Sequence, residues 1–255
     1  MGKEPRIRPV AADSKAGPSG RDRNRISTCI SGLDERMGGG IPKGFINLVA
    51  GPAGSMKSSL CFSIALRAAT KGGRALYITL EQDGESLLAQ MASLGLRTED
   101  LKGLRVVDFS AVQEDLAKAA EEGKLHETLG GLLERYRKEM GCDVLVLDSL
   151  DALFSIMELE KPRQELFHLF RRLKGIGATV LLISEMMPDE KRFGKHGVEE
   201  FLADGIIHLR TRELETASLT SVRRYVGVVK MRQTAHDTDY HPFLFTRDGF
   251  ELVLE

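Results

Sequence analysis

The chain has 255 residues, of which 42% are hydrophobic and 29% are charged, and its formal net charge is −1. This composition is typical of a globular protein with a buried core. A net charge so near zero excludes a global field that attracts nucleic acid or membrane, so any such contact must be local. The cysteines are odd in number and far apart, which favours a reducing compartment over a disulfide framework. Because no apolar signal core or membrane-span run is present, we expect a cytoplasmic protein without membrane contact.

Residues 1–25 differ in composition from the rest of the chain. They contain seven basic residues, three acidic residues and three prolines, with little apolar periodicity. This pattern predicts a disordered basic tail. A solvated leader is the first interpretation of the tail, and weak contact with nucleic acid or an acidic partner is the second. We expect residues 26–255 to form one domain.

From Ile26 onward, short apolar runs alternate with amphipathic stretches. The predicted strands are 45–50, 74–80, 104–109, 143–147, 178–184, 205–210 and 225–231, and the predicted helices are 57–70, 84–94, 111–121, 125–140 and 162–175. This alternation predicts an α/β fold with a mostly parallel central sheet and helices on both faces. The runs after residue 205 are separated by charged turns, so we expect antiparallel or hairpin additions toward the C-terminus.

Residues 51–59 read Gly-Pro-Ala-Gly-Ser-Met-Lys-Ser-Ser and fit the P-loop pattern G-x-x-x-x-G-K-[ST], except that Met56 replaces the second glycine. The segment follows a predicted strand and begins a predicted helix, so backbone N–H groups and the helix N-terminus would face phosphates. We expect Lys57 to neutralise the β- and γ-phosphates of ATP and Ser58 to place its hydroxyl on Mg²⁺. The nucleotide-binding set predicted from this loop is Gly51, Gly54, Ser55, Met56, Lys57, Ser58 and Ser59.

Three further predicted strands end in polar side chains. Asp148 ends the run 143–147, where a P-loop protein holds Mg²⁺, usually through water. Glu81 ends the run 74–80 and would polarise a water for attack on the γ-phosphate. Its alternative role is a helix-capping charge, because Asp83 and Gly84 follow. Ser184, with Glu185, ends another strand and is a candidate γ-phosphate sensor.

A family resemblance extends over about residues 26–251. The segments 25–34 and 38–44 lead into the P-loop, and Tyr77-Ile-Thr-Leu-Glu81-Gln82, Leu147-Asp148-Ser149, 198–205, 230–236 and 241–243 continue it. Together these segments resemble the RecA-superfamily ATPases, and most closely the KaiC-like domains. The resemblance implies a RecA-like P-loop fold and ring hexamers with ATP at subunit interfaces. It also implies that Lys230 and Arg232 reach the nucleotide of a neighbouring subunit, with Thr234 and His236 beside that nucleotide and Thr246 as a further contact.

The chain departs from the family pattern at several positions. The usual catalytic pair Glu-Glu is Glu81-Gln82 here, which predicts slow turnover with Gln82 beside the nucleotide. Residues 199–204 lack an acceptor hydroxyl where the clock protein phosphorylates itself, so we do not expect autokinase activity. Arg247 stands where the family often has an acid. Without the resemblance, Lys230 and Arg232 would be solvent-facing charges on an edge strand, whose i, i+2 spacing puts them on one face.

Three functions remain open from the sequence. The first is a hexameric, Mg²⁺-dependent ATPase that drives a signalling or regulatory cycle with an unknown protein partner. The second is a scaffold that assembles on ATP with negligible turnover, as Gln82 and Met56 favour. The third is a DNA-dependent recombinase-like protein, supported by the basic tail and the segment 186–200. That segment mixes Lys191, Arg192, Lys195 and His196 with four acids and Phe193, whereas single-strand binders usually have a clearly basic groove, so DNA binding is possible but not favoured.

Overall fold

A computed structural model describes residues 24–96, 102–108, 125–156, 161–186, 191–215, 220–247 and 249–253. Nearly all of the predicted basic tail and the whole predicted helix 111–121 lie outside the described residues. The remaining predicted helices and strands are present with bounds within a few residues of those expected, except that the last two strands are longer.

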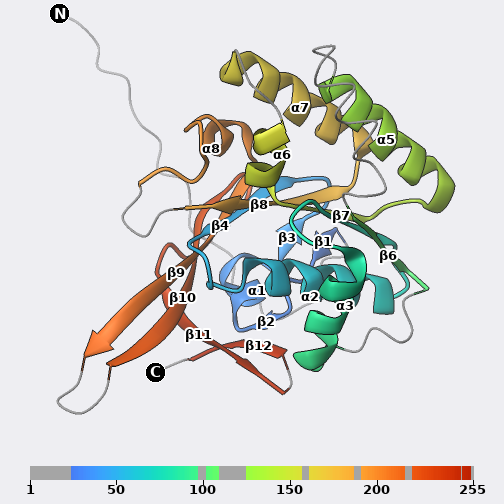
Figure 1. The fold of residues 1–255 in the computed structure, drawn as a ribbon. Coiled ribbons are helices and arrows are strands. Elements are labelled where there is room, and N and C mark those ends of the chain that lie inside the picture. The colour runs from blue at the N-terminus through green and yellow to red at the C-terminus, as the bar shows by residue number, and fades with distance from the viewer. Residues whose placement is uncertain are drawn as a thin grey trace, which may run out of the picture.

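A ten-stranded sheet forms the centre of the molecule, in the order β2-β12-β11-β10-β9-β4-β8-β7-β5-β6 (Figure 1). The strands from β9 to β6 in this order pair in parallel. They are β4 (Ile46–Gly51), β5 (Ala75–Thr79), β6 (Leu104–Asp108), β7 (Val144–Asp148), β8 (Thr179–Glu185) and β9 (Gly205–Glu215). The antiparallel part consists of β10 (Thr220–Met231), β11 (His241–Thr246) and β12 (Gly249–Leu252). The predicted mostly parallel α/β architecture is confirmed.

Two details of the C-terminal strands differ from expectation. β9 was expected among the antiparallel additions, yet it pairs in parallel with β4 and only its other side pairs antiparallel with β10. β10 is not the outermost strand of the sheet, because β11 pairs with it at Tyr225 and Val226. Short segments complete the sheet region: β1 (Arg25–Ile26) pairs with β3 (Ile41–Pro42), α1 (Leu33–Arg36) lies between them, and β2 (Ile30–Ser31) pairs with β12.

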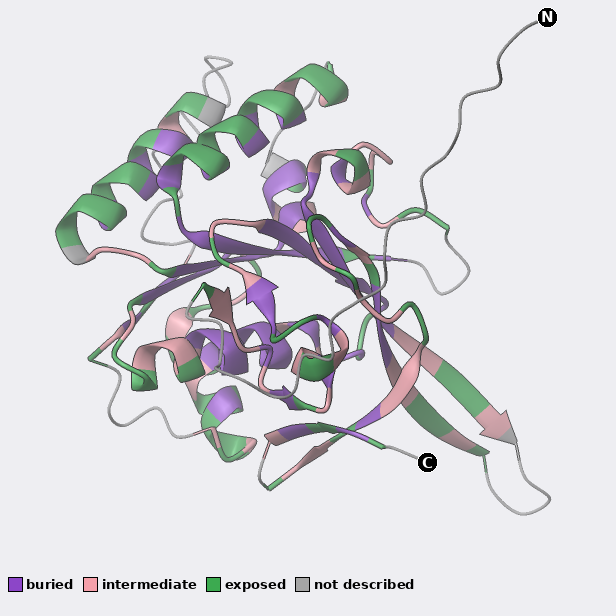
Figure 2. Cartoon of the chain, turned by 180° about the vertical axis from the view of Figure 1, so that it is seen from behind, coloured by how far each residue is buried: buried purple, intermediate pink, exposed green. Residues whose placement is uncertain are grey.

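Helices cover both faces of the sheet (Figure 1). On one face lie α2 (Lys57–Thr70) and α3 (Gly84–Ser93). On the other lie α5 (Leu125–Met140), α6 (Leu150–Ile156), α7 (Pro162–Ile176) and α8 (Glu199–Leu202). Each face has its own hydrophobic cluster, so the central strands are buried on both sides and form near-continuous apolar runs (Figure 2).

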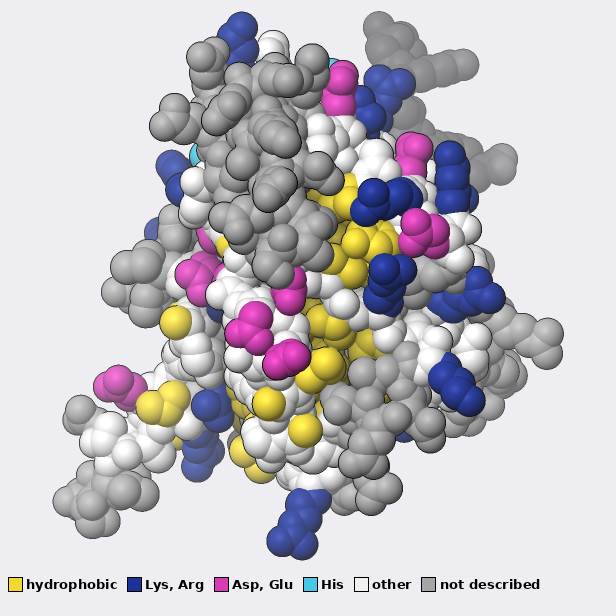
Figure 3. Space-filling model, turned by 45° about the vertical axis from the view of Figure 1, so that its right-hand side comes forward, with side chains coloured by type: hydrophobic (Ala, Val, Ile, Leu, Met, Phe, Trp, Pro, Cys, Tyr) yellow, Lys and Arg dark blue, Asp and Glu magenta, His cyan; other side chains and the backbone are white. Residues whose placement is uncertain are grey.

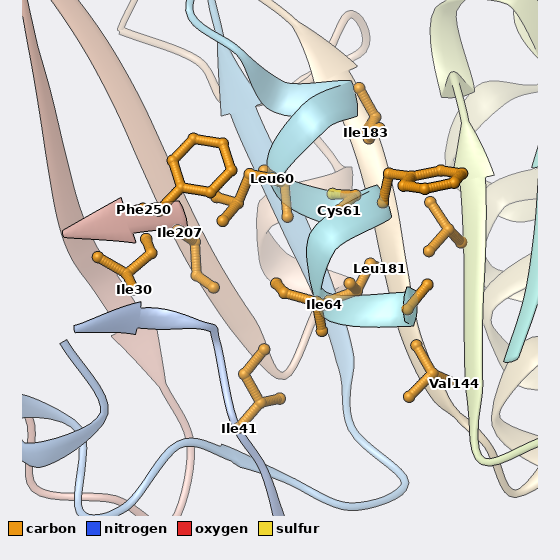
Figure 4. Packing of buried hydrophobic residues seen from close by; sticks show 14 of the residues in the cluster. Ile30, Ile41, Leu60, Cys61, Ile64, Val144, Leu181, Ile183, Ile207 and Phe250 are labelled. Carbon is orange, nitrogen blue, oxygen red and sulfur yellow. The ribbon is translucent and has the colours of Figure 1, made fainter. Parts of the chain in front are cut away.

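Packing of α2 against the sheet fixes the position of the segment that precedes it. Leu60, Cys61 and Ile64 of α2 belong to the same hydrophobic cluster as Leu181 and Ile183 of β8, and Leu60 lies toward Phe250 and Ile207 (Figure 4). All three α2 side chains are completely buried. Burying such side chains stabilises the fold by about 1.5–3 kcal/mol each for the larger ones. The N-terminus of α2 is therefore held firmly at the end of β4.

β9 and β10 continue beyond the rest of the sheet as a two-stranded arm (Figure 1). Only residues 205–208 of β9 pair with the parallel sheet through β4. Near the other end of β10, the register shifts between Val228 and Lys230, so Val229 is an extra residue in the strand. Such a bulge changes the direction of the side chains that follow it.

Within the described residues, no helix is both long enough and apolar enough to cross a membrane. The three cysteines have free thiols. The face shown in Figure 3 carries both basic and acidic side chains, with apolar side chains grouped between them.

Candidate nucleotide site

The loop between β4 and α2 has the geometry of a phosphate cradle. Gly54 and Met56 have positive φ angles of 75° and 72°, which turn the chain sharply before α2 begins at Lys57. The Ser55 hydroxyl donates to the Pro52 carbonyl oxygen at 2.7 Å and closes the loop from inside. Successive N–H groups of such a turn, together with the helix N-terminus, bind anions.

Gly51 lies where the loop leaves the sheet and has no room for a side chain. A Cβ atom at this position would lie 2.5 Å from the Leu209 carbonyl oxygen and 2.9 Å from the Ser55 Oγ atom. We expect Gly51→Ala to lower the free energy of unfolding by about 1–3 kcal/mol, as overpacking does, measured by urea denaturation. The matched control is Gly131→Ala in α5, where a Cβ atom meets nothing within 4 Å; it should stabilise the protein by about 0.5–1 kcal/mol. Equal stability of the two variants would contradict the steric argument.

Met56 occupies the left-handed backbone conformation that the usual second glycine adopts without cost. A non-glycine residue in this conformation costs on the order of 1 kcal/mol or more. The Met56 side chain is half-buried and packs against the hydrophobic cluster around α2. The irregular residue in the motif therefore contributes packing at the position where it introduces backbone strain.

Lys57 is folded back onto the loop. Its side-chain Nζ atom donates to the carbonyl oxygens of Gly51 at 2.9 Å and Pro52 at 3.0 Å, and the residue is only 7% exposed. Burial lowers the pKa of Lys57, while the negative charges of Glu185, Glu81 and Asp148 act in the opposite direction. A buried ammonium group among carboxylates is suited to exchange loop carbonyls for phosphate oxygens.

Asp148 ends β7 next to the loop and is 2% exposed. Its Oδ2 atom accepts a hydrogen bond from the Tyr77 hydroxyl, whereas its Oδ1 atom is buried without a hydrogen-bond partner among the described residues. The Ser58 hydroxyl also interacts with this carboxyl group. Burial raises the pKa of Asp148, and the hydrogen bonds from Tyr77 and Ser58 offset part of that rise.

This arrangement fits Mg²⁺. A buried carboxylate oxygen without a partner is costly, and a hard cation beside it supplies the missing interaction. The described residues hold no group of three or more His, Cys, Asp or Glu side chains that would form an all-protein metal cage. Mg²⁺ at nucleotide sites uses one or two protein oxygens together with phosphates and water, so Asp148 and Ser58 suffice.

The Tyr77–Asp148 hydrogen bond leads to a prediction on pH dependence. Burial is the largest cause that raises the pKa of Tyr77 well above its ordinary value, so the phenol stays a donor to the carboxylate. A carboxylate binds Mg²⁺ in its ionised form, and the pKa of Asp148 is raised, so any Mg²⁺-dependent ATP hydrolysis at this site should decline as the pH falls toward that pKa. In Tyr77→Phe the Asp148 carboxylate loses a hydrogen-bond donor that stabilises its ionised form, so the pKa of Asp148 should rise. The fall in activity on the acid side of the pH profile (the acid limb) should therefore move to higher pH. A kcat/KM profile between about pH 5 and 8 measures the shift.

The matched control for that experiment is Tyr136→Phe. Tyr136 lies on α5 under Arg105, whose guanidinium carbon is 4.7 Å from the ring centroid, and it belongs to the hydrophobic cluster on the face of the sheet opposite α2. An acid limb that moves equally in both variants would show that loss of a buried phenol, rather than loss of the bond to Asp148, causes the shift.

Glu81 lies two residues beyond the end of β5, at the same sheet edge as Asp148. The registry pairs Thr79 with Asp148, and the Leu80 amide donates to the Asp148 carbonyl oxygen at 2.6 Å. The Ser149 hydroxyl donates to Glu81 Oε1. The Glu81 side chain is exposed toward solvent, so it is accessible to a water molecule at this edge.

The alternative role of Glu81 as a helix cap is not the one the structure shows. Asp83 caps α3, since its side chain accepts a hydrogen bond from the Ser86 amide at 2.8 Å. Gln82 contacts α3 as well, because its Nε2 atom donates to Gln90 Oε1 at 3.2 Å. Of these three residues, Glu81 is the one whose side chain accepts a hydrogen bond from Ser149, the residue that follows β7.

Ser184 and Glu185 end β8 beside the loop. Ser184 is 1% exposed, and Glu185 is level with Gly51 in the parallel pairing of β8 with β4. The Glu185 amide donates to Asp151 Oδ2 at 2.7 Å, and the Met186 amide donates to the Gly51 carbonyl oxygen at 3.1 Å. The ends of β4, β5, β7 and β8 thus bring Lys57, Asp148, Glu81 and Ser184 to one edge of the sheet.

Lys230 and Arg232 lie at the opposite end of the strands. Met231 is level with Gly205, and Gly205 is level with Asn47 near the start of β4. The distance from Asn47 to Gly51 along β4 is about 13 Å at the usual rise per residue. Both side chains contact α8: Lys230 donates to the Glu200 and Ala203 carbonyl oxygens at 2.8 and 2.7 Å, and Arg232 to that of Phe201 at 3.1 Å. They therefore share one side of the strand, as their spacing predicted, and are far from the loop of their own chain.

Thr234 and His236 follow β10 and lie beyond the same end. The Thr234 hydroxyl accepts a hydrogen bond from Arg25 at 3.2 Å, and the Thr234 carbonyl oxygen is 3.1 Å from His236 Nδ1. Thr246 is elsewhere, at the turn between β11 and β12, where its hydroxyl donates to the Gly249 carbonyl oxygen at 3.2 Å. Its neighbours Phe245 and Arg247 line a cavity of about 240 Å³ along α2, whose other walls include Ser63, Arg67, Leu94 and Leu96.

Comparison with known proteins decides the family. A family model described as "ATPase: KaiC" matches residues 26–254. The chain belongs to this KaiC ATPase family. Among its relatives is a UPF0273 protein of Aeropyrum pernix, 30% identical over 238 residues that cover 89% of this chain and 92% of the relative. A solved KaiC-like protein from Pyrococcus horikoshii covers 90% of this chain and 99% of its own, with 27% identity and a TM-score of 0.75.

The clock proteins of the family are longer than this chain. The circadian clock protein KaiC2 of Synechocystis is 28% identical over 232 residues, which cover 90% of this chain but 40% of the relative. The chain thus spans less than half the length of the clock proteins it matches. Membership of the KaiC family supports ATPase activity in general terms.

In the segment 186–200, which would bind DNA in a recombinase, residues 187–190 lie outside the described residues. Phe193 is half-buried, and its ring lies edge-on to His208 at 5.1 Å between centroids. The buried Glu199 accepts hydrogen bonds from the His196 and Val198 amides, so acidic side chains organise this loop. An aromatic ring packed in this way does not form the open stacking platform of single-strand binders.

Several residues of the KaiC-like site were missed from the sequence. Tyr77 and Ser149 lie in segments that carry the family resemblance, but no role was predicted for either side chain. Arg224 lies on the arm, yet its Nε atom donates to the Gly54 carbonyl oxygen at 3.2 Å. These contacts join segments about 70 to 170 residues apart, and local sequence patterns carry no signal for such pairs.

Proposed function

We propose that residues 26–255 form a cytoplasmic, Mg²⁺-dependent ATP hydrolase of KaiC-like type. It works as a ring hexamer with ATP bound between subunits, and slow hydrolysis drives a conformational cycle that a partner protein reads. The observation that carries this proposal is the convergence of Lys57, Asp148 and Glu81 at one sheet edge around the loop 51–56.

Each of these side chains has a distinct part in hydrolysis. Lys57 and the N-terminus of α2 bind the phosphates, and Asp148 and Ser58 hold Mg²⁺. When bound, Mg²⁺ neutralises phosphate charge. Glu81 accepts a proton from the attacking water, and the Ser149 hydroxyl orients its carboxylate. Ser184, which is level with Ala50 just before the loop, is assigned the role of γ-phosphate sensor.

The nucleoside part of ATP is proposed to lie along α2. The cavity beside Thr246 has apolar walls in Leu94, Leu96 and Phe245 that suit a flat base. Ser63 lines it with a buried hydroxyl that has no hydrogen-bond partner among the described residues. Lys57 and Ser63 are about 9 Å apart along the helix, so one ligand can contact both the loop and this cavity.

The positions of Lys230 and Arg232 support a ring. They cannot serve the loop of their own chain, because they lie at the other end of the strands. In a head-to-tail assembly the same side chains face the loop of the next copy. There, cations supplied by a neighbour stabilise transition-state charge, and Thr234 and His236 lie beside the same nucleotide.

One observation favours the second function, an ATP-gated scaffold with negligible turnover. Gln82 is an uncharged amide engaged with Gln90 of α3, and it stands where the family often has a second carboxylate. A scaffold would bind ATP and assemble, but phosphate release would stay at background.

The experiment combines sizing with phosphate release. The proposal expects a larger assembly in ATP and Mg²⁺ than in EDTA, and release of phosphate that requires Mg²⁺. Assembly without release identifies the scaffold. Release that needs single-stranded DNA identifies the recombinase-like function, and a monomer under all conditions refutes the ring.

A further inference from the structure

Asp204 connects α8 to β9 and binds two cations with its two oxygens. Oδ1 accepts a hydrogen bond from Arg232 Nη1 at 3.1 Å, and Oδ2 accepts one from Lys174 Nζ at 2.6 Å. The Asp204 side chain is 13% exposed, whereas both cationic side chains are 50% exposed. The carboxylate is thus a mostly buried anchor for two groups that extend toward solvent.

The anchor is itself fixed to the sheet. Asp204 Oδ2 also accepts from the Ile46 amide at 3.1 Å, and the Asp204 amide donates to the Ile46 carbonyl oxygen at 2.7 Å. Ile46 begins β4, the strand that leads to the loop 51–56. Asp204 therefore has little freedom to move relative to the central sheet.

Arg232 makes two hydrogen bonds with its side chain and one with its backbone amide. Besides the bond to Asp204, its Nη2 atom donates to the Phe201 carbonyl oxygen at 3.1 Å, and its amide donates to the Asp204 carbonyl oxygen at 2.9 Å. A guanidinium group has five N–H donors in one plane, and these bonds use two of them among the described residues. The two bonds fix the orientation of the Arg232 guanidinium plane, and its other N–H groups can still donate to an anion.

We propose that Asp204 is a positioning residue that holds the Arg232 guanidinium ready for the nucleotide of a neighbouring copy. This inference rests on the proposed function, in which Arg232 acts in trans. An arginine without an anchor loses side-chain conformational entropy when the nucleotide binds. An anchored arginine has lost that entropy on folding, so binding of the nucleotide costs less.

The ionised state of Asp204 is consistent with this role. Burial acts to raise the pKa of Asp204, but hydrogen bonds from Lys174, the Ile46 amide and Arg232 outweigh it and hold that pKa below its ordinary value. The carboxylate is therefore charged at neutral pH, where a charge-assisted bond to a guanidinium is strong.

The test is Asp204→Asn, assayed as the full chain with ATP and Mg²⁺. The asparagine oxygen can still accept from Lys174 and Ile46, while its amide group presents a donor to the donors of Arg232. We expect kcat to fall about 10²-fold, as for a displaced catalytic group, with a small change in KM for ATP. Assembly measured by sizing should be retained.

Two comparisons separate positioning from general damage. Lys174→Gln removes the other cation from Asp204 but leaves the bond to Arg232, so its kcat should stay within about threefold of wild type. In an Arg232→Ala background, Asp204→Asn should cause no further loss, because the two residues act as one unit. If Asp204→Asn does not fold, Asp204→Glu takes its place, since the added methylene moves the carboxylate while keeping its charge.

The outcomes are distinct. An unchanged kcat in the Asp204 variant, or an equal fold-loss with and without Arg232, overturns the positioning role and leaves the proposed function intact. If Arg232→Ala alone does not lower kcat, the trans-acting part of the proposed function fails, and the role of Asp204 fails with it.

Discussion

Replacement of Glu81 with glutamine is expected to lower kcat for ATP hydrolysis about 10²- to 10⁴-fold, the usual contribution of a general base. Glutamine keeps the size of the side chain and can still accept the hydrogen bond from Ser149. It cannot take a proton from water. ATP affinity should change little, because phosphate binding is assigned to Lys57 and the loop. Phosphate release and equilibrium binding of ATP, measured on the same preparation, test both parts.

The control for this variant is Glu85→Gln, which removes an exposed carboxylate from the first turn of α3. Its kcat should match that of wild type. If Glu81→Gln and wild type release phosphate at the same background rate, the enzyme interpretation fails and the scaffold is favoured. If Glu81→Gln loses ATP binding instead of turnover, Glu81 supports the structure of the site and is not its base.

Replacement of Arg232 with alanine is expected to lower kcat about 10³-fold or more, as removal of a trans-acting arginine does in related chemistry. The expectation follows from the proposed ring and from the place of Arg232 at the far end of the strands, away from the loop 51–59 of its own chain. The assembled ring should remain visible by sizing. Arg171→Ala, an exposed arginine of α7, is the matched control and should keep its activity.

Mixing experiments show whether Arg232 acts in trans. Rings of Arg232→Ala alone and rings of Glu81→Gln alone should both be slow. In an equal mixture, roughly one quarter of the interfaces combine an intact Glu81 with an intact Arg232 from the next copy. Activity should therefore recover in the mixture. No recovery, with subunit exchange demonstrated, would mean that both residues serve the same subunit.

Much of the fold could be predicted because its signals are local. The runs that became β4, β5 and β7 are apolar on both sides, which indicates strands between two layers of helices. The pairing partners of β9 and β10 were not predicted, since nothing in their own sequence shows that β4 and β11 lie beside them. The short helices α6 and α8 were also missed, because helices of 7 and 4 residues show almost no periodicity.

The candidate site divides in the same way. Lys57, Asp148 and Glu81 were found because each follows a predicted strand, and the ends of parallel strands meet at one edge. The backbone conformation of Met56 was not evident, as a side chain at that position only signalled a constraint. Asp204 appeared within a family motif, but its bonds to Lys174 and Arg232 depend on packing between distant segments.

The placement of Lys57 and Arg232 at opposite ends of the strands has a consequence for how turnover would depend on protein concentration. When each site combines the loop of one subunit with the Arg232 of the next, a single subunit has one part of each of two different sites and no complete site. An open row of copies always leaves one unfinished half at each terminus, and only closure joins those two halves into a working site. Specific activity per subunit should then rise with concentration and level off once rings predominate, so dilution alone would switch the enzyme off without any inhibitor.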